Sequence, residues 1–176
     1  SGRPDKFVNA HQMDEWCTDM DSMLEDIATG SERIDRVVRE LNEFARSAES
    51  SDHQPLQVND IIQKAQTLVG AQIRQTFDRF NLVLEPDLPE IIAHPTKLEQ
   101  VVANLVVNAT HAVRPHVKAE LNIYSRQLED PPAVLIQVED NGQGIAVELR
   151  ERIFEPFFTT RRETGGTGLG LSVCYR

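Results

Sequence analysis

Two asparagines at helical spacing are the first residues of this sequence that could do chemistry. Asn104 and Asn108 lie four residues apart in an apolar stretch, and His111 follows three residues later. On a helix these positions share one side. Asparagine is a mediocre helix former, and an isolated pair usually marks solvated positions. The alternative is a pair of amide oxygens lining a cleft, which suit a hard cation such as Mg²⁺ that keeps waters and substrate phosphates as its other ligands.

Two glycine-containing segments follow the asparagines. Asp140 ends an apolar strand pattern and precedes Gly142 and Gly144, where glycine lets the backbone turn sharply or approach a ligand closely. An acid at a strand end can accept a hydrogen bond from a ligand amine. The later run 165–172, Gly-Gly-Thr-Gly-Leu-Gly-Leu-Ser, could present backbone N–H groups to phosphate at the start of a helix, although it lacks the lysine of a P-loop.

Between the glycine segments lies an aromatic stretch, residues 153–162, in which three phenylalanines stand beside two arginines. By itself this stretch reads as a hydrophobic plug under a surface loop with solvent-facing charges. Each of the four segments is therefore a weak signal when it is taken alone.

The elements that must position these residues follow from hydrophobic periodicity. It predicts a helix over 57–75, a strand at 81–84, a helix that begins at Thr96 with a capping box ending at Glu99, and strands at 120–124 and 133–138. This order predicts an α/β (α+β) two-layer sandwich, a mixed sheet covered by helices, rather than repeated βαβ units.

The N-terminal part of the chain has a different composition. The net charge is −10, and residues 11–52 hold twelve acids against four bases. An apolar stripe at three- and four-residue spacing predicts one long, coiled-coil-like helix, with Met13, Cys17, Met20, Leu24, Ile27, Ser31, Ile34, Val38, Leu41 and Ala45 on the stripe. Such a helix packs on its own domain or on a partner, and we expect a dimerisation element.

We therefore expect four regions. Residues 1–10 are a disordered or vector-derived start, 11–49 a helix of a dimerisation hairpin, 50–56 a linker, and 57–176 the main domain. The acidity argues against nucleic acid as a partner. No apolar run is long enough for a membrane span, so we expect no membrane contact in this segment. Cys17 and Cys174 match no disulfide or zinc pattern, which favours a reducing, cytoplasmic setting.

Taken together and in order, the four segments resemble the ATP-binding domain of two-component sensor histidine kinases, of the superfamily that includes DNA gyrase, heat-shock chaperone and mismatch-repair ATPases. Residues 98–109 resemble its N box, 140–145 its first glycine box, 154–160 its F box and 166–172 its second glycine box. The resemblance covers about 57–176. It extends more weakly to 22–46, which resembles the second helix of the dimerisation hairpin.

The resemblance implies ATP and Mg²⁺ as cofactors and a role for each matching residue. Asn108 would coordinate Mg²⁺, with Asn104 assisting it or the phosphates, and Asp140 would accept from the adenine amine. The phenylalanines of the F box would hold the base of an ATP lid, about 157–167, rather than touch the nucleotide. The other implied nucleotide contacts are His111, Gly142, Gly144, Arg161, Gly166, Thr167, Gly168, Leu169 and Gly170.

One position separates kinases from ATPases in this resemblance. Gyrase-like ATPases carry a glutamate four residues before the magnesium asparagine, where it activates water, and here that residue is Asn104. This favours transfer of the γ-phosphate to a histidine and onward to the receiver domain of a response regulator. The open alternatives are a serine kinase or ATPase relative, and a degenerate kinase that signals through ATP binding or dimerisation alone.

No phosphoacceptor histidine is identified in the sequence. His11 lacks the neighbouring acid and the following proline of the family's acceptor segment. The chain also stops early in the helix after the second glycine box. We therefore expect a partial hairpin, forming a homodimer through 11–49, followed by a catalytic domain that is truncated at its C-terminus.

Overall fold

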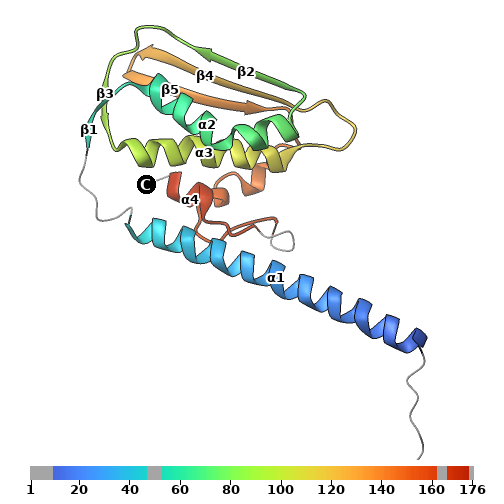
Figure 1. Cartoon of the computed structure of the whole chain (residues 1–176). Coiled ribbons are helices and arrows are strands. Elements are labelled where there is room, and N and C mark those ends of the chain that lie inside the picture. The colour runs from blue at the N-terminus through green and yellow to red at the C-terminus, as the bar shows by residue number, and fades with distance from the viewer. Residues whose placement is uncertain (1–9, 47–52, 162–165, 175–176) are drawn as a thin grey trace, which may run out of the picture. The chain divides into compact units, whose positions relative to one another are not determined.

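The computed structural model describes residues 10–46, 53–161 and 166–174 (Figure 1). Most of the expected start at 1–10, the first half of the expected linker and the middle of the expected lid, 162–165, lie outside the described residues. The chain divides into two compact units, 1–42 and 43–176, which are described separately.

The described part of the first unit is the helix α1 (Ala10–Arg46), whose last four residues belong to the second unit. The apolar stripe thus predicted a single long helix correctly. Seven apolar side chains of α1 are 48–67% exposed: Trp16, Met20, Met23, Leu24, Ile27, Ile34 and Val38. A helix that leaves such a stripe in water gains little from folding by itself, so this face is suited to packing against another helix.

The second unit is a two-layer α+β sandwich, as the sequence predicted. Its three-stranded sheet has the order β2-β4-β5, with β2 parallel to β4 and β4 antiparallel to β5, so the sheet is mixed. The two long helices α2 and α3 lie against one face of this sheet (Figure 1). The elements are α2 (Val58–Thr76), β2 (Arg79–Leu84), α3 (Pro95–Ala112), β4 (Glu120–Glu129), β5 (Pro132–Asp140), the 3₁₀ turns η1 (Val147–Leu149) and η2 (Arg152–Phe154), and α4 (Gly170–Cys174).

The core forms where the two helices meet the sheet. Both helices have an apolar side with 3.6-residue periodicity, and the strands contribute alternate residues. The fully enclosed side chains include Ile62 of α2, Val102 and Val106 of α3, and Leu121 and Ile123 of β4. Burying them against each other fixes α3 on the sheet, and with it the asparagines on another side of α3.

A second, small sheet was missed by the sequence analysis. β1 (Gln54–Leu56) pairs antiparallel with β3 (Ile91–Ala93), so residues 54–56 form a strand where a linker was expected. Three-residue strands are too short to show a periodic pattern, and the proline in β1 argued for a loop.

The start of α3 also differs from the prediction. The expected capping box at Thr96 is wrong, because the cap is His94, whose Nδ1 accepts a hydrogen bond from the Lys97 N–H at 3.4 Å. Pro95 takes the first helical position, where its missing N–H costs no hydrogen bond.

Within the described ranges, no helix combines the length and the apolar character that crossing a bilayer requires.

Two isoleucines provide a matched test of this core. Ile123 on β4 is fully buried, whereas Ile92 on β3 is 75% exposed. We expect Ile123→Ala to lower the free energy of unfolding by about 2–5 kcal/mol, because it removes buried apolar atoms and leaves a cavity. Ile92→Ala should change it by less than about 0.5 kcal/mol. Urea denaturation of both variants measures the difference, and equal losses would contradict the described core.

Candidate functional site

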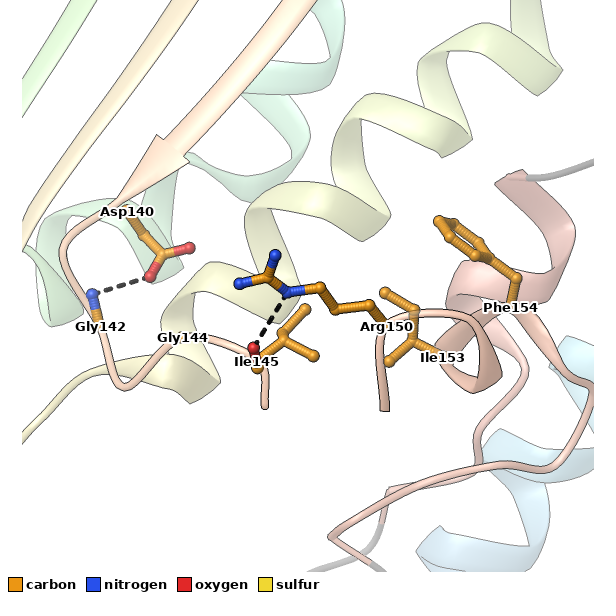
Figure 2. A pocket seen from close by; sticks show the side chains of 7 residues that line it. All are labelled: Asp140, Gly142, Gly144, Ile145, Arg150, Ile153 and Phe154. Atoms are coloured by element: carbon orange, nitrogen blue, oxygen red, sulfur yellow. Dashed lines mark hydrogen bonds between the residues drawn. The ribbon is translucent and has the colours of Figure 1, made fainter. Parts of the chain in front are cut away.

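A cavity of about 480 Å³ opens beside the end of β5. Figure 2 shows its wall, which is made of Asp140, Gly142, Gly144, Ile145, Arg150, Ile153 and Phe154. These residues come from the last residue of β5, the loop after it and the two 3₁₀ turns. The wall combines one carboxylate and one guanidinium with apolar side chains, which is the composition of a small-molecule site.

The carboxylate of Asp140 is held in a fixed orientation. Its Oδ1 accepts a hydrogen bond from the Gly142 N–H at 2.8 Å (Figure 2). A Cβ on residue 142 would collide with the Ala112 carbonyl oxygen and lie 2.6 Å from Asp140 Oδ1. Only glycine therefore lets the loop pass between the end of α3 and the carboxylate. The second oxygen of Asp140 makes no hydrogen bond to the part of the chain that the structure describes.

The loop that carries this carboxylate is held by hydrogen bonds of Asn141 and Gln143. The Asn141 Oδ1 accepts from the Glu120 N–H at 2.9 Å, and its Nδ2 donates to the Lys118 carbonyl at 2.8 Å. Arg114 donates to the Asn141 carbonyl at 2.9 Å. The next residue, Gln143, donates its N–H to the Ala112 carbonyl at 2.8 Å. These bonds make the loop a rigid support for Asp140.

Four cavity residues were not singled out by the sequence analysis as nucleotide contacts: Ile145, Arg150, Ile153 and Phe154. Arg150 Nε donates to the Ile145 carbonyl at 3.3 Å, so its side chain lies along the cavity wall (Figure 2). Phe154 departs from the expectation that the phenylalanines only hold the lid base. The isolated apolar and basic residues of 145–154 showed no periodicity in the sequence, so only their spacing after the glycines could have indicated them.

The two ends of the expected lid meet in a main-chain contact. The Phe157 N–H donates to the Gly168 carbonyl at 3.0 Å, and the Gly166 N–H donates to the Arg161 carbonyl at 2.9 Å. Gly168 has φ 72°, and a Cβ there would lie 2.5 Å from the Phe157 carbonyl carbon. Phe157 itself has φ 66°, an uncommon value for a non-glycine residue that marks local backbone strain.

Arg161, Thr167 and Leu169 belong to the same lid base. The Arg161 N–H donates to Thr159 Oγ1 at 3.0 Å, and the Leu169 N–H donates to Thr167 Oγ1 at 3.4 Å. Leu169 is fully buried, so it acts as the apolar anchor of this segment. Next to it, the Arg152 guanidinium lies 4.3 Å from the centre of the Phe158 ring, a cation–π contact.

The two asparagines of α3 have different surroundings. Asn104 Nδ2 donates to the Gly170 carbonyl at 3.0 Å and lies 4.0 Å from Cys174 Sγ. Asn108 Nδ2 is buried and has no hydrogen-bond partner among the described residues. A buried donor without a partner is costly, and in native proteins it commonly marks a place where a ligand or water binds.

The cysteine in this neighbourhood is shielded. Burial raises the pKa of the Cys174 thiol, and the hydrogen bond with Asn104 counteracts this only in part. The Cys174 Sγ donates to the Gly170 carbonyl at 3.2 Å. The thiol form is therefore the one that fits the site.

Of the predicted site residues, Asp140, Gly142 and Gly144 are brought together on the cavity wall. Arg161, Gly166, Thr167, Gly168 and Leu169 gather at the lid base, and Gly170 begins α4 beside Asn104. His111 is exposed in the last turn of α3. The segments thus form neighbouring parts of one unit, joined by α3.

Comparison with known proteins identifies relatives of this unit. Residues 93–176 match the family described as histidine kinase-, DNA gyrase B-, and HSP90-like ATPase. The sensor histidine kinase ZraS of Salmonella typhimurium is 35% identical over 147 residues, which cover 84% of this chain and 30% of ZraS. The chain thus spans less than a third of that relative's length.

Solved structures agree with the sequence comparison. The catalytic domain of the histidine kinase ThkA is 32% identical, with a TM-score of 0.60 over 70% of this chain and 78% of that domain. ThkA in complex with the response regulator protein TrrA is matched at 24% identity and a TM-score of 0.61, covering 91% of this chain and 42% of that one, which shows the fold alone.

Gly168 tests the lid base, and Gly144 in the loop after β5, which also has a positive φ, is its control. Gly144→Ala should cost about 1–2 kcal/mol of stability, because φ is 69° but the space for a Cβ is open. Gly168→Ala should cost about 1–3 kcal/mol more, because the new Cβ overlaps the Phe157 main chain. Thermal unfolding measures both. Amide exchange of Phe157 should rise at least about tenfold in Gly168→Ala alone, since only that variant breaks its hydrogen bond. Equal effects in the two variants would contradict this contact.

The two thiols should differ in reactivity. Cys17 is exposed, whereas the Cys174 pKa is raised by burial, so less of the reactive thiolate is present on Cys174 at any given pH. We expect iodoacetamide at about pH 8 to modify Cys17 at least about tenfold faster, and the ratio to narrow as the pH rises. Peptide mass spectrometry of timed samples checks this. In denaturant the two rates should converge, and a ratio that persists there would point to sequence context rather than burial.

Proposed function

Because this chain belongs to the histidine kinase-, DNA gyrase B-, and HSP90-like ATPase family and matches histidine kinase catalytic domains, we propose that it supplies the ATP-binding, phosphoryl-transferring part of a sensor histidine kinase. The observation that carries the proposal is the cavity beside β5, in which the Asp140 carboxylate is fixed by Gly142 and faced by apolar side chains.

The cavity is the binding site of the adenine base. The second oxygen of Asp140 accepts from the exocyclic amine, and Ile145 and Ile153 pack on the base. Gly142 and Gly144 keep the chain close to the base without a side chain between them. Arg150, extended along the wall, contacts the outer edge of the nucleotide.

The phosphates lie toward α3 and the lid base, near Asn108, His111, Arg161 and residues 166–170. The amide oxygen of Asn108 could ligate Mg²⁺ bound with ATP, and its buried Nδ2, which has no partner among the described residues, could donate to a phosphate oxygen. Among the described residues no cluster of three His, Cys, Asp or Glu side chains could hold a metal, so most ligands would be phosphate oxygens and waters. When bound, Mg²⁺ neutralises phosphate charge.

Phosphoryl transfer goes to a histidine rather than to water. A hydrolase needs a base near the γ-phosphate, and the amide of Asn104 cannot take a proton. A histidine imidazole is itself nucleophilic and needs little help from a base. The family's acceptor segment is not identified in the sequence, so the acceptor lies on a polypeptide segment outside it. If no such acceptor exists, the chain acts as an ATP-binding signalling module, and this is the competing function.

The proposed partners are a second copy of the chain and a response regulator receiver domain, in a reducing cytoplasmic setting. The exposed apolar stripe of α1 supports a homodimer through 11–49, because a second helix would bury it. The proposal of a response regulator partner is supported by the similarity in fold to ThkA, whose structure was solved in complex with the response regulator protein TrrA.

Replacing the fixed carboxylate tests base recognition. Asp140→Asn should weaken ATP binding about 10- to 100-fold, because an amide keeps the bond to Gly142 but offers a donor where the base amine also donates. Asp60→Asn on the exposed side of α2 is the matched control and should leave the dissociation constant unchanged. Isothermal titration calorimetry measures both. Unchanged affinity in Asp140→Asn would refute this assignment.

The transfer reaction is tested by mixing the chain with γ-labelled ATP, Mg²⁺ and a separate hairpin fragment that carries an acceptor histidine. We expect acid-labile label on the fragment, and its loss in Asn108→Ala. ATP binding with no label on any hairpin fragment would favour the signalling module instead.

A further inference from the structure

Asn104 has a role that the metal assignment does not describe. Resting on the proposed function, we propose that Asn104 is a positioning residue that ties the C-terminal end of the lid to α3 through its Nδ2. Its side chain links α3 to the segment 166–172, which resembles the second glycine box.

The Nδ2 of Asn104 is bonded to the protein. It donates to the Gly170 carbonyl at 3.0 Å, across 66 residues of sequence. The same nitrogen lies 4.0 Å from Cys174 Sγ, and that thiol donates to the same carbonyl at 3.2 Å. The Gly170 carbonyl therefore receives two donors, one from α3 and one from the next turn of α4.

This carbonyl is close to the lid base along the chain. Gly168, two residues earlier, accepts from the Phe157 N–H, and Leu169 between them is fully buried. Holding Gly170 in place therefore also holds the nearby Gly168 carbonyl, which accepts from the Phe157 N–H. Ser172, whose Oγ donates to the Leu169 carbonyl at 2.8 Å, strengthens the same turn.

Asn108 behaves in the opposite way. It stands one helical turn further on, and its Nδ2 is buried without a partner among the described residues. The Asn104 Nδ2 is held by the Gly170 carbonyl, whereas the Asn108 Nδ2 has no acceptor among the described residues and is available to donate to a phosphate oxygen or a water. The two Nδ2 groups therefore differ: that of Asn108 is available to a ligand, and that of Asn104 is bonded to the segment after the lid.

Replacing each asparagine by aspartate separates these roles, because aspartate has the same size but opposite hydrogen-bonding character. A carboxylate is at least as good a ligand for Mg²⁺ as an amide oxygen. It cannot donate to the Gly170 carbonyl, and it would place negative charge against that oxygen. A metal ligand therefore tolerates the change, whereas a residue that holds the lid by donating does not.

The experiment compares Asn104→Asp with the matched control Asn108→Asp in the full chain. ATP affinity is measured calorimetrically in excess Mg²⁺ and in EDTA, and amide exchange is followed in 166–174 and in β4 without nucleotide. For Asn104→Asp we expect about a tenfold weaker affinity under both conditions, and about tenfold faster exchange in 166–174 with β4 unchanged. For Asn108→Asp we expect the affinity in excess Mg²⁺ to be retained, because a carboxylate still ligates the metal, and exchange to be unchanged.

An Asn104→Asp variant that loses affinity only in Mg²⁺, or that matches the wild type in affinity and exchange, would overturn the inference. If this variant does not fold, Asn104→Ala, which removes the donor without adding charge, should give the same pattern at about threefold. Faster exchange in β4 as well would indicate a general loss of packing and would also overturn it. If the wild type binds no ATP, the proposed function fails, while the exchange comparison still decides the role of Asn104.

Discussion

The packing of α3 against α2 and the sheet is the interaction on which the rest of this unit depends. Val102 and Val106 are buried completely, which fixes both the rotation and the height of the helix. Three other parts then take their positions from α3: the first glycine loop through the Ala112 carbonyl, α4 through Asn104, and Asn108, whose buried Nδ2 has no partner among the described residues. A single apolar stripe thus sets the geometry of all the polar chemistry around it.

Most contacts that shape the site are made by main-chain groups. The first glycine loop is held through the main-chain carbonyls of Ala112 and Lys118 and the Glu120 N–H, and the lid base is held through Phe157 and Gly168. Main-chain groups are present in every residue, so the sequence constrains these contacts mainly by demanding glycine where a Cβ would collide, as at positions 142 and 168. The spacing of the glycines therefore indicates where the backbone passes close to other groups, and it does not indicate which residues bind a ligand.

A feature could be predicted from the sequence when it carries a periodic pattern of side chains, and less well when it depends on main-chain contacts. The long α1, the mixed sheet and α3 carry strong periodic patterns, and each was predicted correctly in type. β1 and β3 have three residues each and show no period, and the cap at His94 is a local bond from a residue type that is not among the preferred N-caps, so the pattern favours Thr96. In the site, motif order indicated Asp140 and the glycines. It could not separate Asn104 from Asn108, because their difference depends on a carbonyl 66 residues away.

The fixed orientation of Asp140 has a consequence for which bases the cavity rejects. An ionised carboxylate offers only acceptors in any orientation, and with Oδ1 held by the Gly142 N–H the second oxygen is the acceptor left for a base. Guanine carries a carbonyl oxygen where adenine carries its amine, so in the proposed site two acceptors would face each other across a desolvated contact. Discrimination then rests on repulsion of the wrong base as much as on attraction of the right one. In the proposed site, the acceptor that binds the adenine amine would therefore also disfavour guanine.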